Sequence, residues 1–385
     1  MLFAVDAHAV GSRLTGNEVY IRSLLAAMAE LPGSWELLAY ISRPEAEAWL
    51  PTRVRRARVS ANPFVRLGAD LPRLLRRHRP SLIHVQYTAP LHCPTPVVVT
   101  VHDVSFLEHP EFFSSWRAKQ LRWTVRRTVA RAAHVLTGSE FSARAIARHY
   151  RGSAPEITVI PHAAASMFRP VARETAAAKV RWRFGIEPPF LLAVGDLQPR
   201  KNQAGLVEAF AGLLRVLPGS KLRLVLAGKP TAYAARVRAA AVRLGVAERT
   251  HFLGYVSDED LLYLYNACEL FVFPSWYEGF GIPLLEAMAC GAPVVCSNRS
   301  ALPEVADAAA LFFDPASTEQ MVRAMRDALL ADELRLRLKR LGLQRAAQFT
   351  WQRTAEQTLR IYRRVAAADA RPSAASLPTA HVSRG

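Results

Sequence analysis

The chain has few cysteines and no long apolar segment. Its 385 residues include four cysteines, Cys93, Cys268, Cys290 and Cys296, with no C-x-x-C pair. Neither a disulfide framework nor a zinc site is therefore indicated, and a reducing cytoplasm is the expected environment. No stretch approaches the roughly 18 uninterrupted apolar residues of a membrane-spanning helix, and Asp6 interrupts the apolar start. We expect an unexported cytoplasmic protein, either soluble or peripheral at the inner face of a membrane.

Acidic residues are outnumbered, since 50 Lys+Arg stand against 32 Asp+Glu and give a formal net charge of +18. Nucleic acid, an anionic membrane and a polyphosphate substrate all suit such an excess. No helix-turn-helix, zinc-finger or aromatic-strand signature accompanies the charge, so we expect no nucleic-acid partner. Residues 116–131 form a basic amphipathic pattern with Trp116 and Trp123. That pattern fits an anionic membrane surface, or an inward-packing stripe beneath a solvated arginine face.

Short apolar runs alternate with helical patterns along the chain. The runs predicted as strands are residues 2–5, 36–41, 82–85, 97–101, 134–137, 157–160, 190–194, 221–227, 251–252, 270–272, 294–296 and 310–312. Several are apolar at consecutive positions, as in parallel strands covered by helices on both faces. The pattern therefore predicts an α/β fold with two Rossmann-like, doubly wound domains facing a central cleft, where ligands of such sheets bind.

Prolines mark the domain boundary. Pro170, Pro188 and Pro189 flank an Ala-rich, helical stretch. We expect an N-terminal Rossmann-like domain over 1–170, a C-terminal Rossmann-like domain over 171–350, a helix over 351–368 that crosses back to the first domain, and a disordered tail over 369–385.

The segment 274–295, PSWYEGFGIPLLEAMACGAPVV, carries Glu278 and Glu286, with Gly279 and Gly281 just after the first and a helical pattern around the second. Glycines between a carboxylate and a helix start let backbone N–H groups approach a ligand, and the helix N-terminus favours an anion such as a sugar phosphate. Two glutamates alone would more often cap the helix or face solvent.

A second polar segment, GDLQPRKN, covers residues 195–202. Gly195 ends a predicted strand, and Arg200 and Lys201 follow it. Two cations at a strand end suit a diphosphate. The alternative is a basic turn that enters a helix, which Asn202 would cap or orient.

Polar residues also follow strands of the first half. Gly16 is expected in a loop before an amphipathic helix, and the loop lacks the G-x-G-x-x-G dinucleotide fingerprint. His102 and Asp103 end the strand 97–101. There His102 is either a satisfied structural group or a functional one that bonds or handles a proton.

Together these segments resemble the retaining nucleotide-sugar glycosyltransferases of family 4, which have the GT-B fold. Residues 274–295 match the E-x7-E signature, 195–202 the RKN element, 137–146 the SEFS element, and 99–113 the HD-xxxxxxP-E-FF element of a mannosyltransferase-like branch. The resemblance covers about residues 2–365 and implies that the N-terminal domain, 1–170, is the acceptor domain and the C-terminal domain, 171–350, the nucleotide-sugar donor domain. It implies a hexosyltransferase that moves mannose from GDP-mannose to a glycan or lipid-linked acceptor in polysaccharide or glycoconjugate biosynthesis. UDP-glucose or a UDP-N-acetylhexosamine as donor, a sugar-nucleotide epimerase, and a non-catalytic protein remain the alternatives.

The resemblance also implies a role for each site residue. Glu278 would lie beside the transferred sugar near His102, and Glu286 would hydrogen-bond the nucleotide ribose. Arg200 and Lys201 would hold the diphosphate and stabilise it as a leaving group. Further donor contacts are expected from Gly16, Gly195, Gly279, Phe280 and Gly281, and the acceptor side from Asp103, Ser139 and Glu140, with Ser139 or Ser142 capping a helix. No metal and no other cofactor is expected, and transfer proceeds by front-face attack or through Glu278 as a nucleophile.

Overall fold

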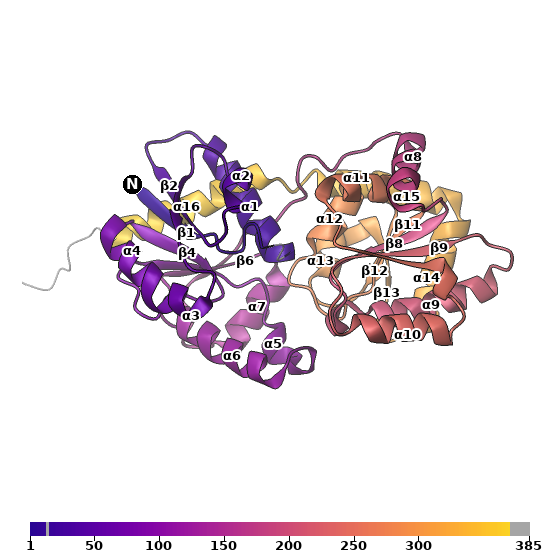
Figure 1. Ribbon diagram of the computed structural model, residues 1–385, viewed down its shortest axis with the longest axis horizontal. Coiled ribbons are helices and arrows are strands. Elements are labelled where there is room, and N and C mark those ends of the chain that lie inside the picture. Colours follow the sequence, from indigo (N-terminus) through magenta and orange to yellow (C-terminus); the bar gives the residue numbers. More distant parts are fainter. Residues whose placement is uncertain (13–14, 370–385) are drawn as a thin grey trace, which may run out of the picture.

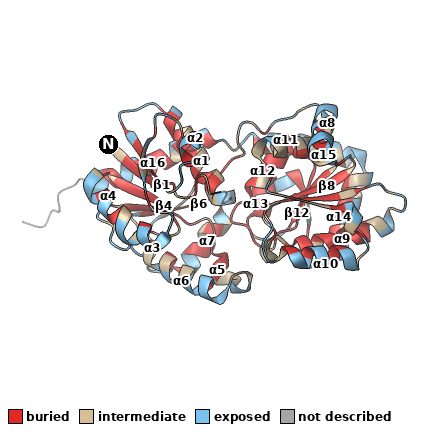
Figure 2. Ribbon diagram, in the orientation of Figure 1, coloured by how far each residue is buried: buried red, intermediate tan, exposed pale blue. Residues whose placement is uncertain are grey.

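The computed structural model describes residues 1–12 and 15–369 and shows two α/β lobes side by side (Figure 1). Each lobe is built on a parallel sheet with helices packed on both faces. The strands are largely buried and the outer helix faces are exposed (Figure 2). This arrangement confirms the predicted fold class. The predicted disordered tail lies outside the described residues from position 370 onward.

The first lobe contains a parallel sheet with strand order β3-β2-β1-β4-β5-β6-β7. Its strands are β1 (Leu2–Asp6), β2 (Glu36–Ile41), β3 (Arg55–Arg58), β4 (Leu82–Gln86), β5 (Val97–Thr100), β6 (His134–Thr137) and β7 (Ile157–Val159). Its helices are α1 (Thr15–Glu30), α2 (Ala46–Trp49), α3 (Pro63–Val65), α4 (Leu71–His78), α5 (Ser105–Glu108), α6 (Ser115–Val129) and α7 (Glu140–His149), with the short turns η1 (Arg66–Asp70) and η2 (Pro110–Phe112).

The second lobe contains a parallel sheet with strand order β10-β9-β8-β11-β12-β13. Its strands are β8 (Phe190–Val194), β9 (Arg223–Ala227), β10 (Thr250–Gly254), β11 (Leu270–Phe273), β12 (Val294–Ser297) and β13 (Ala310–Phe313). Its helices are α8 (Arg173–Phe184), α9 (Gln203–Val216), α10 (Ala234–Arg243), α11 (Asp258–Ala267), α12 (Ile282–Ala289), α13 (Leu302–Ala306), α14 (Thr318–Leu330) and α15 (Asp332–Ala346), with the short turns η3 (Pro199–Lys201), η4 (Ala247–Arg249) and η5 (Asp307–Ala309).

Every predicted apolar run forms a strand, with ends shifted by at most two residues. The sequence prediction missed β3, whose residues read RRAR. This strand lies at the edge of the sheet, paired with β2. An edge strand with little burial needs no apolar run, so hydrophobic patterning gives no signal for it.

The last described helix, α16 (Trp351–Asp369), ties the two lobes together. It follows α15 of the second lobe and packs against α1 and β4 of the first (yellow in Figure 1). The ring of Tyr362 meets Phe3 of β1 edge-on at 5.3 Å, and its hydroxyl lies 2.5 Å from Nδ1 of the buried His84. Apolar residues of both lobes therefore join one continuous core cluster through this helix and the linker.

Candidate active site

Two cations and a carboxylate meet at the carboxyl edge of the second sheet. Strands β8 and β11 are neighbours, and the segments that follow them carry Arg200 and Lys201 on one side and Glu278 on the other. Arg200 Nη1 lies 2.9 Å from Glu278 Oε2, and Lys201 Nζ lies 2.7 Å from Glu278 Oε1. Arg200 also donates to the Tyr277 carbonyl at 2.7 Å. Residues 77 and 78 positions apart in sequence thus form one charged cluster.

The electrostatics of this cluster favour an added anion. Burial alone would raise the pKa of Glu278, but the charges of Lys201 and Arg200 outweigh burial and lower that pKa to about 2. Burial lowers the pKa of Lys201 more than the charge of Glu278 raises it, whereas the pKa of Arg200 is raised by Glu278 in spite of burial. Arg200, Lys201 and Glu278 together carry a charge of +1, and the carboxylates of Asp103 and Asp196 also act on the two cations.

The backbone at the end of β8 packs against the side chain of Lys201. Gly195 has φ +144°, and a Cβ built there would lie 3.3 Å from Cε of Lys201, so the lysine stem packs on the glycine. Asn202 occupies the N-cap position of α9, as expected, but it does not cap the helix through its side chain. Its side chain makes no capping hydrogen bond and instead donates to the Pro315 carbonyl at 3.1 Å. Asn202 adopts left-handed backbone, φ 54°, and its side chain lies over Gly205 in the first turn of α9, where a Cβ on that glycine would come within 2.5 Å of Asn202 Oδ1.

The turn after Glu278 approaches the first lobe closely. A Cβ built on Gly279 would lie 2.1 Å from the backbone oxygen of His102, a distance that excludes any side chain at this position. Phe280 is buried and its ring contacts His162, with centroids 4.9 Å apart. Gly281, with φ +98°, precedes α12 in the left-handed conformation that favours glycine. Contact with the first lobe therefore explains the glycine at position 279, and the left-handed backbone before α12 explains the glycine at position 281.

Glu286 lies inside α12, buried at 6% exposure. It accepts a hydrogen bond from the Tyr265 hydroxyl at 2.9 Å. Burial, with a smaller contribution from the charge of Asp258, raises the pKa of Glu286 to about 8. Asp258 in turn pairs with Arg22 of the first lobe at 2.5 Å. This glutamate is thus apart from the hydrogen bonds that surround Glu278, near a second contact between the lobes.

His102 and Asp103 emerge from β5 of the first lobe. Nε2 of His102 lies 2.8 Å from Gln86 Oε1, and its ring stands edge-on to Tyr20 with centroids 4.8 Å apart. Burial lowers the pKa of His102 to about 4, so the ring is neutral at physiological pH. Asp103 accepts hydrogen bonds from the backbone and hydroxyl of Ser105, at 2.9 and 2.7 Å, at the start of α5.

Ser139 and Glu140 begin α7 at the junction of the lobes. Ser139 caps the helix, as predicted, by accepting from the Ser142 backbone at 3.1 Å. Its hydroxyl also donates to the Gly279 carbonyl of the second lobe at 2.7 Å. The Glu140 residue is exposed, and its backbone N–H donates to Glu304 of the second lobe at 2.7 Å. Ser139 therefore faces the other lobe rather than an open acceptor surface.

The expected loop position of Gly16 is wrong. Gly16 lies in the first turn of α1, is exposed, and a Cβ built on it would meet nothing within 4 Å. The preceding loop is held instead through Glu18, which accepts from the Gly11 backbone at 2.9 Å. The helix begins before the apolar pattern does, because its first turn carries few apolar residues. This earlier start explains the difference.

Sequence reasoning missed several supporting residues. Gln86 ends β4 just as His102 follows β5, so the rule that singled out the histidine would also have found the glutamine. Tyr265 carries no comparable signal, because it is one polar residue in an ordinary helical pattern. Ser142 was expected as a possible helix cap, but its contact with Gly279, 137 positions away, was not expected.

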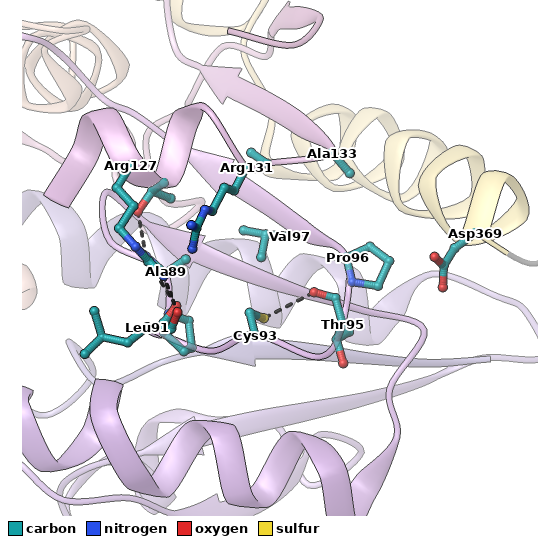
Figure 3. Close-up of a pocket in the computed structure, with 13 residues that line it drawn as sticks. Ala89, Leu91, Cys93, Thr95, Pro96, Val97, Arg127, Arg131, Ala133 and Asp369 are labelled. Carbon is teal, nitrogen blue, oxygen red and sulfur yellow. Dashed lines mark hydrogen bonds between the residues drawn. The ribbon is translucent and has the colours of Figure 1, made fainter. Parts of the chain in front are cut away.

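Cavities lie elsewhere on the molecule. One of about 320 Å³ opens in the first lobe, where Arg127 and Arg131, at the end of α6, face the segment 89–97 (Figure 3). Another, of about 330 Å³, lies between the lobes beside Phe280 and Glu304. Across residues 1–12 and 15–369, no three or more His, Cys, Asp or Glu side chains are grouped so that they could hold a metal ion.

Comparison with known families finds matches in both lobes. The family model "Glycosyl transferases group 1" matches residues 176–345, and "Glycosyltransferase Family 4" matches residues 14–164. The O-antigen chain mannosyltransferase B of Escherichia coli is 35% identical over 268 residues, which are 69% of this chain and 70% of that protein. The D-inositol 3-phosphate glycosyltransferase of Saccharomonospora viridis is 31% identical over 284 residues, 71% of this chain and 65% of that protein.

Solved structures share the two-lobed architecture at low sequence identity. Sucrose-phosphate synthase from Thermosynechococcus elongatus superposes with a TM-score of 0.76 at 22% identity, covering 95% of this chain and 99% of that one. Anabaena HepE in complex with UDP-glucose gives a TM-score of 0.77 at 19% identity, covering 94% and 99%. At these identities the likeness establishes the fold.

Proposed function

This chain belongs to the family 4 glycosyltransferases of the GT-B fold and transfers a sugar from a nucleotide sugar; we propose that the sugar is mannose, the donor GDP-mannose, and the stereochemistry retaining. The acceptor in this proposal is a glycan or lipid-linked sugar of a polysaccharide or glycoconjugate. The observation that carries the proposal is the cluster of Arg200, Lys201 and Glu278. A net cationic group at a strand end, opposite a histidine of the other lobe, suits a sugar diphosphate.

Two relatives and one sequence element support mannose as the transferred sugar. The E. coli protein at 35% identity is named a mannosyltransferase, as is the E. coli serotype-specific mannosyltransferase WbdA, which is 35% identical over 185 residues, 48% of this chain and 23% of that protein. The HD element that contains His102 and Asp103 resembles the same branch. UDP-glucose is the competing donor, since a structural neighbour is described in complex with it.

The proposed step balances without further reactants. The acceptor hydroxyl oxygen forms a bond to C1 of the sugar on the face from which the β-phosphate oxygen departs, and that oxygen takes the acceptor proton. We assign to Arg200 and Lys201 the neutralisation of charge on the departing diphosphate, in place of a metal ion. Glu278 is ionised at any physiological pH, so it can stabilise positive charge at C1 but cannot donate a proton. His102, being neutral, can hydrogen-bond a sugar hydroxyl.

The double variant Arg200→Ala/Lys201→Ala tests the assignment. We expect sugar transfer to fall at least 100-fold, because two charge-assisted contacts to the diphosphate are lost. Arg323→Ala/Arg326→Ala is the matched control, since it removes two largely exposed arginines from α14 of the same lobe. Undiminished turnover at low donor concentration in the first variant would refute the diphosphate site.

Donor identity is tested by thermal shift with GDP-mannose, UDP-glucose and UDP-N-acetylglucosamine. A ligand that binds the native state raises the melting temperature by mass action. We expect GDP-mannose to give the largest rise. A larger rise with either UDP sugar would overturn the mannose assignment, and conversion of the donor to another sugar nucleotide would indicate an epimerase.

We further propose that α6 binds an anionic membrane surface. Trp116 and Trp123 are 74% and 60% exposed, and the helix is rich in arginine. Its buried residues, Val125 and Val129 among them, pack inward, so the apolar stripe is partly used by the core. Arg127 and Arg131 add positive charge beside the cavity of Figure 3. Within the described residues, none of the helices has the length and apolar character needed to cross a membrane.

Vesicle sedimentation tests this surface. We expect binding to vesicles that contain phosphatidylglycerol, weakening with salt, and loss of binding in Trp116→Ser/Trp123→Ser. Trp182→Ser is the control, because Trp182 is 79% exposed on α8 of the other lobe. Failure to bind anionic vesicles at low salt would retire the proposal.

A further inference from the structure

The Gly279 carbonyl of the second lobe contacts two serine hydroxyls of the first lobe. Ser139, the N-cap residue of α7, donates its hydroxyl to this carbonyl at 2.7 Å. The Ser142 hydroxyl of α7 lies 3.1 Å from the same oxygen and shares its one hydrogen between this oxygen and a second carbonyl. Both serines are fully buried. The Ser142 hydroxyl also lies 3.0 Å from the backbone oxygen of His102. These contacts join the end of β5, the start of α7 and the turn after Glu278 at one point.

The same helix end is fixed by a carboxylate of the second lobe. Glu304 of α13 accepts from the backbone N–H groups of Glu140 and Phe141, at 2.7 and 2.9 Å. The N-terminus of α7 carries unpaired N–H groups and partial positive charge, which a carboxylate satisfies. The backbone at Glu304 is itself held by Arg345, which donates to its carbonyl at 2.8 Å. Ser139 and Ser142 are therefore held firmly against the turn.

The serine contacts fix the orientation of the peptide group between Gly279 and Phe280. A peptide is planar, and its C=O and N–H point in opposite directions. Two hydroxyls on the Gly279 carbonyl therefore determine where the N–H of Phe280 points. Gly279 and Gly281 flank Phe280, and their conformational freedom would let the turn rotate if no contact held it. The preceding residue is already fixed within its own lobe, because the Glu278 N–H donates to Ser300 at 2.9 Å.

We propose that Ser139 and Ser142 are positioning residues, which hold the Gly279–Phe280 peptide so that its N–H faces the sugar diphosphate when the lobes are closed. The proposal rests on the proposed function of the turn as a donor contact. It makes the first lobe a part of the donor site through backbone geometry: lobe opening releases the peptide, and closure orients it.

Ser142→Ala is the sharpest test, because alanine favours the helix and removes only the hydroxyl. Thr250→Val is the matched control, since Thr250 is a buried hydroxyl that donates to the Val246 carbonyl within the second lobe. We expect Ser142→Ala to lower kcat for release of nucleoside diphosphate at least about tenfold, as for a misplaced contact group. Donor affinity, measured by equilibrium titration, should stay within about twofold. A loss no larger than in the control, or an equal loss of donor affinity, would overturn the proposal.

Hydrogen exchange supplies a readout that needs no activity. We expect the amides of residues 279–281 to exchange about fivefold faster in Ser142→Ala, the factor that corresponds to one hydrogen bond. Glu304→Gln should do the same, because an amide offers one acceptor oxygen to two N–H groups. Unchanged exchange in both variants would sink the positioning role. If the unmodified chain releases no nucleoside diphosphate from any sugar nucleotide, the proposed function is wrong. Hydrogen exchange at residues 279–281 would still test whether the serines hold the peptide.

Discussion

Replacing Glu286 with Gln is expected to stabilise the ligand-free protein as the pH rises. The pKa of this buried carboxyl is raised to about 8 from an ordinary 4.5. A raised pKa means that the native state keeps a proton that the unfolded chain has lost. Its favourable effect is complete below pH 4.5 and disappears as the pH rises through 8. At about 1.4 kcal/mol for each tenfold change, native glutamate costs about 4 kcal/mol at pH 8 relative to a group that stays neutral.

The assay is chemical denaturation of the unmodified protein and Glu286→Gln at pH 5 and pH 8. We expect the variant to be more stable at pH 8 by up to about 4 kcal/mol, and the two proteins to differ by less than about 1 kcal/mol at pH 5. The amide can still accept the Tyr265 hydrogen bond. A stability difference that does not grow between pH 5 and pH 8 would refute a raised pKa at this position.

Glu278→Gln is the matched control with the opposite sign. Its pKa is lowered to about 2, so the carboxylate contributes stability above pH 4.5 that is lost as the pH falls toward 2. The difference between the folded and unfolded pKa values corresponds to about 3 kcal/mol. The amide also removes the one carboxylate that forms ion pairs with both Arg200 and Lys201. We therefore expect this variant to be less stable than the unmodified protein at both pH values.

Two further outcomes are expected. Gly279→Ala should lower turnover about 100-fold and increase the radius of gyration in small-angle scattering, because a Cβ 2.1 Å from the His102 oxygen keeps the lobes apart. Gly68→Ala, at a site with nothing within 4 Å of the new Cβ, should change neither, and a compact, active Gly279→Ala would contradict the close approach. Because burial lowers the pKa of His102 to about 4, His102→Gln should reduce kcat/KM by the same factor at every pH from 6 to 9. A factor that varies tenfold across that range would show that the histidine titrates there.

The second-lobe motifs were predictable because their chemistry is local. Glu278 and the glycines after it occupy consecutive positions, as do Arg200 and Lys201, and each group follows an apolar strand. In a parallel sheet the carboxyl ends of the strands share an edge, so strand prediction placed both segments at that edge, and the family resemblance assigned both to one donor. Details were harder to predict in both lobes, since Gly16 of the first lobe proved to be helical and Asn202 of the second makes its side-chain hydrogen bond to the Pro315 carbonyl.

The amino-acid order by itself determined the alternation of apolar strands and helices, the excess of positive charge and the polar residues at strand ends, because each depends on near neighbours in the chain. Only tertiary structure decided that Glu278 pairs with two cations, that Glu286 is buried with no ion pair of its own among the described residues, and that two serine hydroxyls of the other lobe contact the Gly279 carbonyl. Those outcomes depend on burial and on contacts between residues up to 140 positions apart, which no local pattern encodes.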